Sequence, residues 1–148
     1  MKAVIQRVIS ARLEAEGKTV SEIGKGLVIY FGVGKGDTEE HARYVAKKIP
    51  ALRIFEDENG KTNRSVLDIG GEVLFVSQFT LYANATHGNR PDFLGAEEPA
   101  RAEELYLLTA KLLREQLPVK CGIFGADMKI TQENAGPFTL ILEKSNEE

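Results

Sequence analysis

Apolar and polar residues alternate along the first third of the chain, which is the two-residue period of a β-strand with one buried face. Glu16-Gly17-Lys18 is typical of a turn, and the run that follows Gly26 is almost entirely apolar. An uninterrupted apolar run of this length predicts a strand that is buried on both faces. The strands predicted in this part are residues 2–9, 12–16 and 26–33.

Two later segments change to the period of an amphipathic helix, with apolar residues three and four positions apart. The first helix is predicted to begin with Asp37 as N-cap and Glu40 as its reciprocal capping partner, and to end before Pro50. The second is predicted to have Pro99 in its first turn and to stop before Pro118. The expected core-facing stripes are Ala42, Val45, Ala46 and Ile49 in the first helix, and Leu105, Leu108, Leu112 and Leu113 in the second.

The remaining pattern is again mostly β. Asn59-Gly60 favours a tight turn, and residues 83–98 form a polar loop too long for an idle connection, which makes it a candidate functional loop. The order βββαββαβββ lacks the regular alternation of a doubly wound sheet. We therefore expect an α+β fold: a mainly antiparallel, barrel-like sheet with two packed helices, forming a single domain over residues 1–148. The further predicted strands are residues 52–56, 72–81, 119–124, 127–132 and 138–143.

Composition limits the function more than it defines it. The formal net charge of −3 argues against a protein that coats nucleic acid by neutralising phosphates. It leaves open a protein that grips only the end of an RNA. No apolar stretch approaches the roughly 20 residues of a membrane helix, and the single cysteine excludes an internal disulfide. We expect a cytoplasmic protein that does not act on membranes.

Three other kinds of site have little support. The glycine-rich segment Gly32–Asp37 suggests a phosphate loop, but it lacks the Gly-Lys-Ser/Thr ending, and glycine turns before helices are common. His41 and His87 have no ligand partners at metal-binding spacing, and we expect His41 to be a solvated surface residue. Cys121 has no identifiable histidine base and is expected to be a buried strand cysteine. We therefore expect neither a metal nor a cofactor.

Two polar segments interrupt the apolar pattern. In Ser77-Gln78-Phe79-Thr80-Leu81, polar side chains follow an apolar strand, so they either pair with backbone or face a cleft. In Asn134-Ala135-Gly136-Pro137-Phe138-Thr139, Gly-Pro stands before a predicted strand although neither residue supports a β-ladder. A satisfied strand end and a plain turn would explain each segment taken alone.

Together the two segments resemble the signature motifs of D-aminoacyl-tRNA deacylases, Ser-Gln-Phe-Thr and Asn-x-Gly-Pro-x-Thr, in the family's order and at roughly its separation. The resemblance covers essentially the whole chain. Its other parts are Ala3-Val4-Ile5-Gln6-Arg7-Val8, Leu52-Arg53-Ile54-Phe55-Glu56-Asp57, Asn63, Ser65-Val66 and Phe124-Gly125-Ala126-Asp127-Met128.

This resemblance implies a homodimeric hydrolase that cuts the ester of a D-aminoacyl-tRNA, without a cofactor. The Gly136-Pro137 pair of one subunit is expected to reach the other's pocket through a cis peptide bond, which is cheap before proline. Main-chain atoms at glycine can exclude an L side chain by sterics while ignoring the D side chain. Glycine mischarged on an alanine tRNA is an expected second substrate.

The resemblance also implies residue roles. Ser77, Gln78, Phe79 and Thr80 would line the pocket for the terminal adenosine and the ester, with backbone N–H groups near Phe79 and Thr80 stabilising an oxyanion. Thr80 is not expected to be a nucleophile, because no base is identifiable, and the family is thought to use the substrate's 2′-hydroxyl. The supporting residues would be Arg7 behind the Gly-Pro loop, Phe124 and Met128 at the adenine, Asn134 and Thr139 fixing the loop, and Arg90 at a phosphate.

Two alternatives stay open. A sister enzyme that clears L-alanine from a wrong tRNA should have a different first motif and a trans Gly-Pro bond. A noncatalytic dimeric RNA-binding or scaffold protein could keep the fold, and a catalytic assay separates it from both enzymes.

Overall fold

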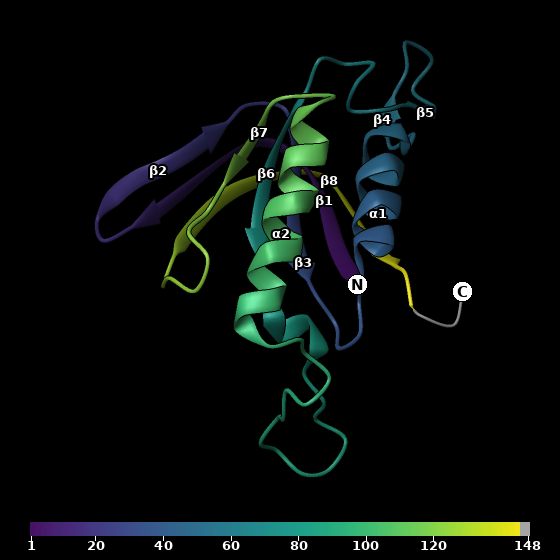
Figure 1. Cartoon of the computed structure of the whole chain (residues 1–148). Helices are drawn as coiled ribbons and strands as arrows, with labels where there is room; N and C mark the ends of the chain where they lie inside the picture. Colours follow the sequence, from purple (N-terminus) through teal and green to yellow (C-terminus); the bar gives the residue numbers. More distant parts are fainter. Residues whose placement is uncertain (146–148) are drawn as a thin grey trace.

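The computed structural model describes residues 1–145. A curved six-stranded sheet has both helices on one of its faces, side by side (Figure 1). The predicted α+β class with two packed helices is therefore confirmed. The elements are β1 (Lys2–Ala15), β2 (Lys18–Ile23), β3 (Gly26–Gly32), α1 (Glu39–Ala51), β4 (Phe55–Glu56), β5 (Thr62–Arg64), β6 (Glu72–Ser77), the 3-10 helix η1 (Phe79–Tyr82), α2 (Pro99–Arg114), β7 (Val119–Cys121) and β8 (Lys129–Glu143).

Most of the pairing in the sheet is antiparallel, as the sequence pattern predicted, but part of the sheet is parallel. β1 pairs antiparallel with β2, β3 and β8, but β3, β6 and β7 run parallel to one another. The parallel half arises because α1 connects β3 to β6 and α2 connects β6 to β7, and parallel neighbours need such crossovers. The sheet nearly closes into a barrel: Ser21 Oγ donates to the Cys121 carbonyl at 2.5 Å, and Lys120 Nζ donates to the Glu22 carbonyl at 2.7 Å.

Two strands are longer than predicted. Residues 2–9 and 12–16 belong to one strand, β1, and the predicted strands 127–132 and 138–143 are both parts of β8. The two long strands pair along almost their whole length, and the ladder shifts register on either side of Val8. Such irregularities let a strand continue through a segment that the sequence indicates as a break. The short strands β2 and β5 were not predicted.

The predicted strand 72–81 ends early, at Ser77. Leu81 N–H then donates to the Gln78 carbonyl at 3.3 Å, and the chain turns into η1. This turn lies against Gly32, where a Cβ would stand only 3.0 Å from the Gln78 carbonyl oxygen. A local strand preference is overridden here by close packing. Likewise, only Phe55–Glu56 of the predicted strand 52–56 pairs, with β5.

The start of α1 differs from the prediction. Thr38, not Asp37, is the N-cap, and the reciprocal partner is His41 in place of Glu40. The Thr38 N–H donates to His41 Nδ1 at 3.0 Å, and the His41 side chain is buried, so the expectation of a solvated surface histidine is wrong. The helix also includes Pro50 and ends at Ala51.

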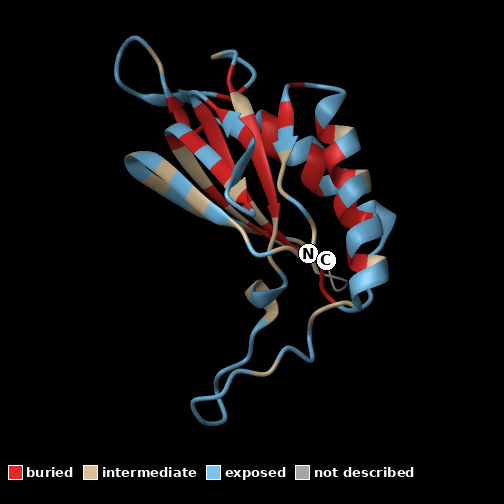
Figure 2. Ribbon diagram, turned by 90° about the vertical axis from the view of Figure 1, so that its left-hand side faces the viewer, coloured by how far each residue is buried: buried red, intermediate tan, exposed pale blue. Residues whose placement is uncertain are grey.

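The core lies on both faces of the sheet. Between sheet and helices, the Phe75 and Tyr106 rings stack with centroids 5.0 Å apart, and the Phe31 ring packs at a tilt against Phe75 at 4.9 Å. The Tyr106 hydroxyl donates to the Phe75 carbonyl at 2.6 Å. The predicted stripe of α1 is fully buried, and Leu105 and Leu113 of α2 are buried beside it (Figure 2). A second cluster fills the concave side of the curled sheet; its buried residues are Val8, Ala11, Leu13, Ile23, Val28, Leu74 and Val76.

No helix within residues 1–145 has the length and apolar character needed to cross a membrane.

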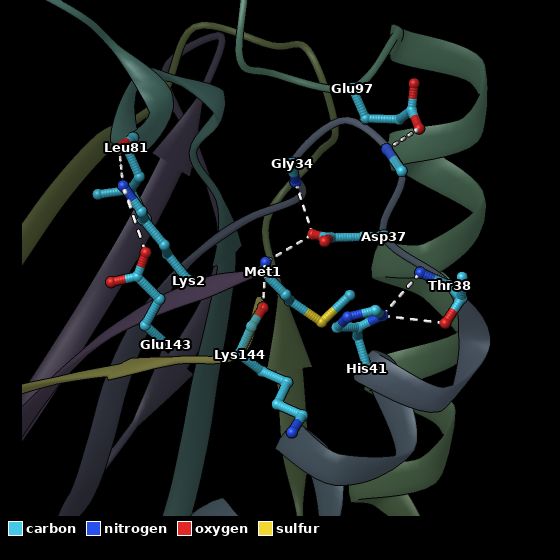
Figure 3. Close-up of polar contacts among 11 residues, drawn as sticks. Met1, Lys2, Gly34, Asp37, Thr38, His41, Leu81, Glu97, Glu143 and Lys144 are labelled. Carbon is cyan, nitrogen blue, oxygen red and sulfur yellow. Dashed lines mark hydrogen bonds and ion pairs between the residues drawn. The ribbon is translucent and has the colours of Figure 1, made fainter. Parts of the chain in front are cut away.

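The chain start is tied to the loop before α1 (Figure 3). The Met1 ammonium group lies 2.6 Å from Asp37 Oδ2 and donates to the Lys144 carbonyl at 2.9 Å. The Gly34 N–H donates to the same carboxylate oxygen at 2.7 Å. The ammonium and the Asp37 side chain are 0% and 4% exposed, so this ion pair is buried. It joins three segments that are distant in sequence.

Asp37→Asn should therefore destabilise the fold. Breaking a buried ion pair by removing one partner leaves an uncompensated charge and costs on the order of 3 kcal/mol. Urea unfolding at neutral pH measures the loss. The matched control is Glu39→Gln, which breaks an exposed i,i+4 pair with Arg43 and should cost about 0.5 kcal/mol or less. Equal losses in the two variants would contradict a structural role of the buried pair.

Candidate active site

A cavity of about 660 Å³ opens between the end of β6, the start of α2 and the segment that follows β7. Three residues of the first motif, Ser77, Gln78 and Phe79, line it, and its walls are mostly apolar. A cavity of this size suits a small ligand or the end of a larger one. The remaining lining residues are Val33, Val76, Phe93, Ala96, Glu97, Glu98, Pro99, Ala102, Phe124, Gly125, Ala126, Asp127, Met128 and Ile130.

The first motif leaves the sheet at this cavity. The Gln78 N–H continues the ladder by donating to the Phe31 carbonyl at 2.8 Å, and its side-chain Nε2 donates to Thr80 Oγ1 at 2.5 Å. Phe79 is 54% exposed and makes an edge-on contact with Phe93 at 5.1 Å. Thr80 is exposed and lies outside the lining of the cavity. The N–H groups of Phe79 and Thr80 open the turn of η1 and make no recorded hydrogen bond with any residue in 1–145.

Phe124 and Met128 form another part of the cavity wall. The Phe124 ring lies 6.0 Å from that of Tyr106, which connects this wall to the core. Met128 Sδ accepts a hydrogen bond from the Ile123 N–H at 3.4 Å and would stand 2.6 Å from a Cβ at position 122. A side chain at position 122 would displace the Met128 thioether from this place.

The second motif lies elsewhere on the protein. Gly136-Pro137 is inside β8, with a cis peptide bond, and both residues are exposed. Within residues 1–145 the lining of the cavity includes neither of them. One chain thus brings the first motif, Phe124 and Met128 together, but it does not bring the Gly-Pro pair to them.

Arg7 packs behind the Gly-Pro loop. Its Nε donates to the Ala135 carbonyl at 3.1 Å, its Nη1 donates to the Ile54 carbonyl at 2.9 Å, and its guanidinium lies 5.1 Å from the centre of the Phe138 ring. A Cβ at Gly136, whose φ is +124°, would stand 2.9 Å from Arg7 Nη2. Glycine is required at this position by both backbone and space.

Two sets of residues around the two motifs were not predicted from the sequence. Gln6 donates to Thr139 and Gln132 donates to Asn134, so the two glutamines contact the two ends of the Gly-Pro motif. In the sequence, the sign of such a role is a glutamine within a predicted β-strand. Glu97, Glu98 and Asp127 place carboxylates around the cavity. The two glutamates end the long loop, and no pattern in the sequence placed them beside Ser77.

The glycine-rich segment serves a structural purpose. A Cβ at Gly34 would stand 2.7 Å from the Tyr82 ring, so this glycine forms the seat for the last residue of η1. Burial raises the pKa of the Tyr82 hydroxyl, and the carboxylates of Asp37 and Glu143 raise it further. The Gly34 N–H faces Asp37 in place of a phosphate.

Residues 1–145 contain no group of three or more histidine, cysteine or acidic side chains able to hold a metal ion. Cys121, predicted to be buried, is only partly buried, and its Sγ accepts a hydrogen bond from Arg114 Nη2 at 3.2 Å.

The long loop 83–98 extends away from the sheet (Figure 1). It is pinned by two hydrogen bonds between the Asn84 and Asp92 backbones and by Lys35 N–H donating to the Gly95 carbonyl. His87 and Arg90 are exposed on it.

Two solved structures share this fold. A solved structure described as c-Myc DNA Unwinding Element Binding Protein superposes with a TM-score of 0.93 at 40% identity, over 98% of this chain and 99% of that one. Another, described as a probable eukaryotic D-amino acid tRNA deacylase, is 18% identical with a TM-score of 0.79, over 95% and 97% of the two chains, and shares the fold.

The family model for D-Tyr-tRNA(Tyr) deacylase matches residues 4–143. The D-aminoacyl-tRNA deacylases of Persephonella marina and Aquifex aeolicus are 57% and 54% identical to this chain, and each comparison covers 97% of both sequences. The chain belongs to the D-Tyr-tRNA(Tyr) deacylase family.

The glycine at position 136 gives a direct test of the loop geometry. Gly136→Ala should lower the free energy of unfolding by roughly 2 kcal/mol or more, since it combines an unfavourable φ with a clash against Arg7 and the Phe138 N–H. The matched control is Gly88→Ala, at φ +93° but with nothing within 4 Å, which should lose about 1 kcal/mol. Guanidinium unfolding measures the free energy of unfolding of both variants. Equal losses would mean that the Gly-Pro loop can shift to accommodate a Cβ at position 136 without further cost.

Proposed function

We propose that this protein is a D-aminoacyl-tRNA deacylase, which hydrolyses the ester between a D-amino acid and the 3′ end of tRNA. The observation that supports this most directly is the cavity lined by Ser77, Gln78 and Phe79 in a chain of the deacylase family. Water supplies the hydroxyl: the acyl carbon–oxygen bond breaks, the amino acid leaves as a carboxylate, and the terminal ribose regains its hydroxyl. The proposal extends to residues 1–148 as one deacylase domain acting in the cytoplasm.

The active enzyme in this proposal is a homodimer. Gly136 and Pro137 are exposed and do not line the cavity of their own chain, so a second copy is needed to bring them to Ser77 and Phe79. The exposed apolar residue Ile141, on the same strand and 67% exposed, gives that copy a surface to cover. Each pocket would then be completed by the Gly-Pro pair of its neighbour.

Chirality would be read by main-chain atoms. With no Cβ at position 136, the carbonyl oxygens of Gly136 and Pro137 can approach the α-carbon and accept hydrogen bonds from the substrate ammonium group. An L side chain would collide with this rigid backbone, whereas a D side chain would point away from it. Glycine has no side chain to exclude, so glycine mischarged on an alanine tRNA would also be cleaved.

Charge on the ester oxygen would be stabilised by the N–H groups of Phe79 and Thr80, which have no recorded partner among residues 1–145. The substrate's own 2′-hydroxyl would assist the attacking water, as the resemblance to the deacylase family implies. A tRNA that ends in 2′-deoxyadenosine should then be deacylated far more slowly. A rate equal to that of the ribose form would rule out this assistance.

The other residues would support the two ends of the substrate. Phe124 and Met128 would contact the adenine, because both line the same cavity as Phe79. Arg7, Asn134 and Thr139 would hold the Gly-Pro loop, as their hydrogen bonds around it suggest. Arg90 on the exposed loop 83–98 would contact a phosphate.

Purified protein should deacylate D-Tyr-tRNA rapidly and leave L-Tyr-tRNA close to its spontaneous rate of hydrolysis. The reason is the steric exclusion of the L side chain by the backbone of the second subunit. Release of labelled tyrosine measures both rates, and sedimentation of the same sample measures the oligomeric state. A folded protein inactive on both esters would support the noncatalytic RNA-binding alternative, and preferential cleavage of L-Ala-tRNA would support the sister enzyme.

Replacing the Thr80 hydroxyl should leave most of the activity. Thr80→Val keeps the shape and the N–H, and removes only the acceptor of the Gln78 side chain; we expect a loss of kcat of no more than about tenfold, the scale of one hydrogen bond. Thr131→Val, an exposed threonine on β8, is the control for the exchange itself. A fall of roughly 10⁴ or more would instead identify Thr80 as a nucleophile.

A further inference from the structure

The β1–β8 ladder is interrupted at the Gly-Pro loop. Gln6 pairs with Thr139 and Val8 with Asn134, so the four residues 135–138 face Arg7 alone. Backbone hydrogen bonds between the strands cannot fix this loop as they fix the rest of the ladder. Its position therefore depends on side chains at its two ends.

A chain of side-chain hydrogen bonds reaches both ends. Gln132 Nε2 donates to Asn134 Oδ1 at 2.6 Å and to Gln6 Oε1 at 2.9 Å. Gln6 Nε2 donates to Thr139 Oγ1 at 3.3 Å. Asn134 precedes the loop and Thr139 follows it, so the two glutamines connect its ends to each other.

Tyr30, on the central strand β3, anchors this chain. Its hydroxyl donates to Gln132 Oε1 at 2.8 Å, and its ring packs against the cluster of buried residues on the concave side of the sheet. Burial raises the pKa of the Tyr30 hydroxyl, so it stays protonated and remains a donor at neutral pH. Gln132 thus accepts one hydrogen bond and donates two.

The chain of hydrogen bonds and Arg7 act from opposite sides. Gln6 and Arg7 are consecutive on β1, and consecutive strand residues point to opposite faces of a sheet. Arg7 holds the Ala135 carbonyl from one face, while Gln6 and Gln132 hold the ends of the loop from the other. The loop lies between two independent restraints.

We propose that Tyr30, Gln6 and Gln132 are positioning residues that fix the Gly136-Pro137 loop for chiral discrimination. The inference rests on the proposed function, because only there does the position of this loop decide which substrate is cleaved. None of the three touches the reacting ester in this arrangement. Their effect is on the ratio of D to L cleavage.

Gln132→Glu is the most informative change. The glutamate is isosteric and can still accept from Tyr30, but it cannot donate to Gln6 or Asn134 and faces their oxygens with a negative charge. Tyr30→Phe removes only the anchoring hydroxyl. The control is Glu133→Gln, the reverse isosteric exchange at the next residue of β8, which is exposed.

For Gln132→Glu we expect the ratio of kcat/KM for D-Tyr-tRNA to that for L-Tyr-tRNA to fall at least about tenfold, the scale of one lost hydrogen bond. Tyr30→Phe should give a smaller fall, and Glu133→Gln none. A merely structural role would lower both rates together and leave the ratio unchanged. Melting temperatures of the three variants show whether the fold is intact.

Hydrogen–deuterium exchange separates this inference from the proposed function. Amide exchange over residues 133–140 of the intact protein should accelerate in Gln132→Glu and not in Glu133→Gln, whatever the enzymatic activity. An inactive wild-type protein in which this difference persists would overturn the deacylase proposal but keep the restraint on the loop. Unchanged exchange, or an unchanged D-to-L ratio in an active enzyme, would overturn the positioning role.

Discussion

The antiparallel pairing of β1 with β8 is the interaction on which the rest of the structure depends. It brings residues near the two ends of the chain together over almost the full length of both strands. The ladder is also interrupted opposite Arg7, where Gly136-Pro137 leaves it. The ladder fixes the residues on both sides of this interruption, and side chains of β1 and β8 hold the residues within it. The proposed selective element is this interruption.

The two motifs share a sheet but not a pocket. Ser77 ends β6 and lines the cavity, whereas Gly136 lies inside β8 and is not part of that cavity's lining. In the proposed dimer, each motif is completed by the other chain. This arrangement would make the site sensitive to anything that shifts one subunit against the other. It would also explain why most of the chemistry is assigned to backbone groups, whose positions a sheet fixes well.

Close packing at glycines connects the active-site turn to the chain start. η1 follows Ser77 and fits onto Gly32 and Gly34 because neither has a Cβ. The loop that carries Gly34 is held in turn by Asp37 and the Met1 ammonium group. The buried ion pair, the glycine seat and the turn of the first motif therefore form one continuous set of contacts. Breaking the ion pair should therefore shift η1 as well.

The sequence by itself determined the fold class, both helices, the buried stripe of α1 and half of the stripe of α2, and the two motifs, because these depend on local periodicity and residue type. Only the tertiary structure decided that β3, β6 and β7 run parallel, that His41 is buried in a helix cap, and that one strand, β8, contains Gly136. It alone revealed the contacts of Gln132, which joins Asn134 to residues more than a hundred positions away. Hydrophobic periodicity reports which face of an element is buried, whereas the partner of a polar side chain depends on packing between distant segments.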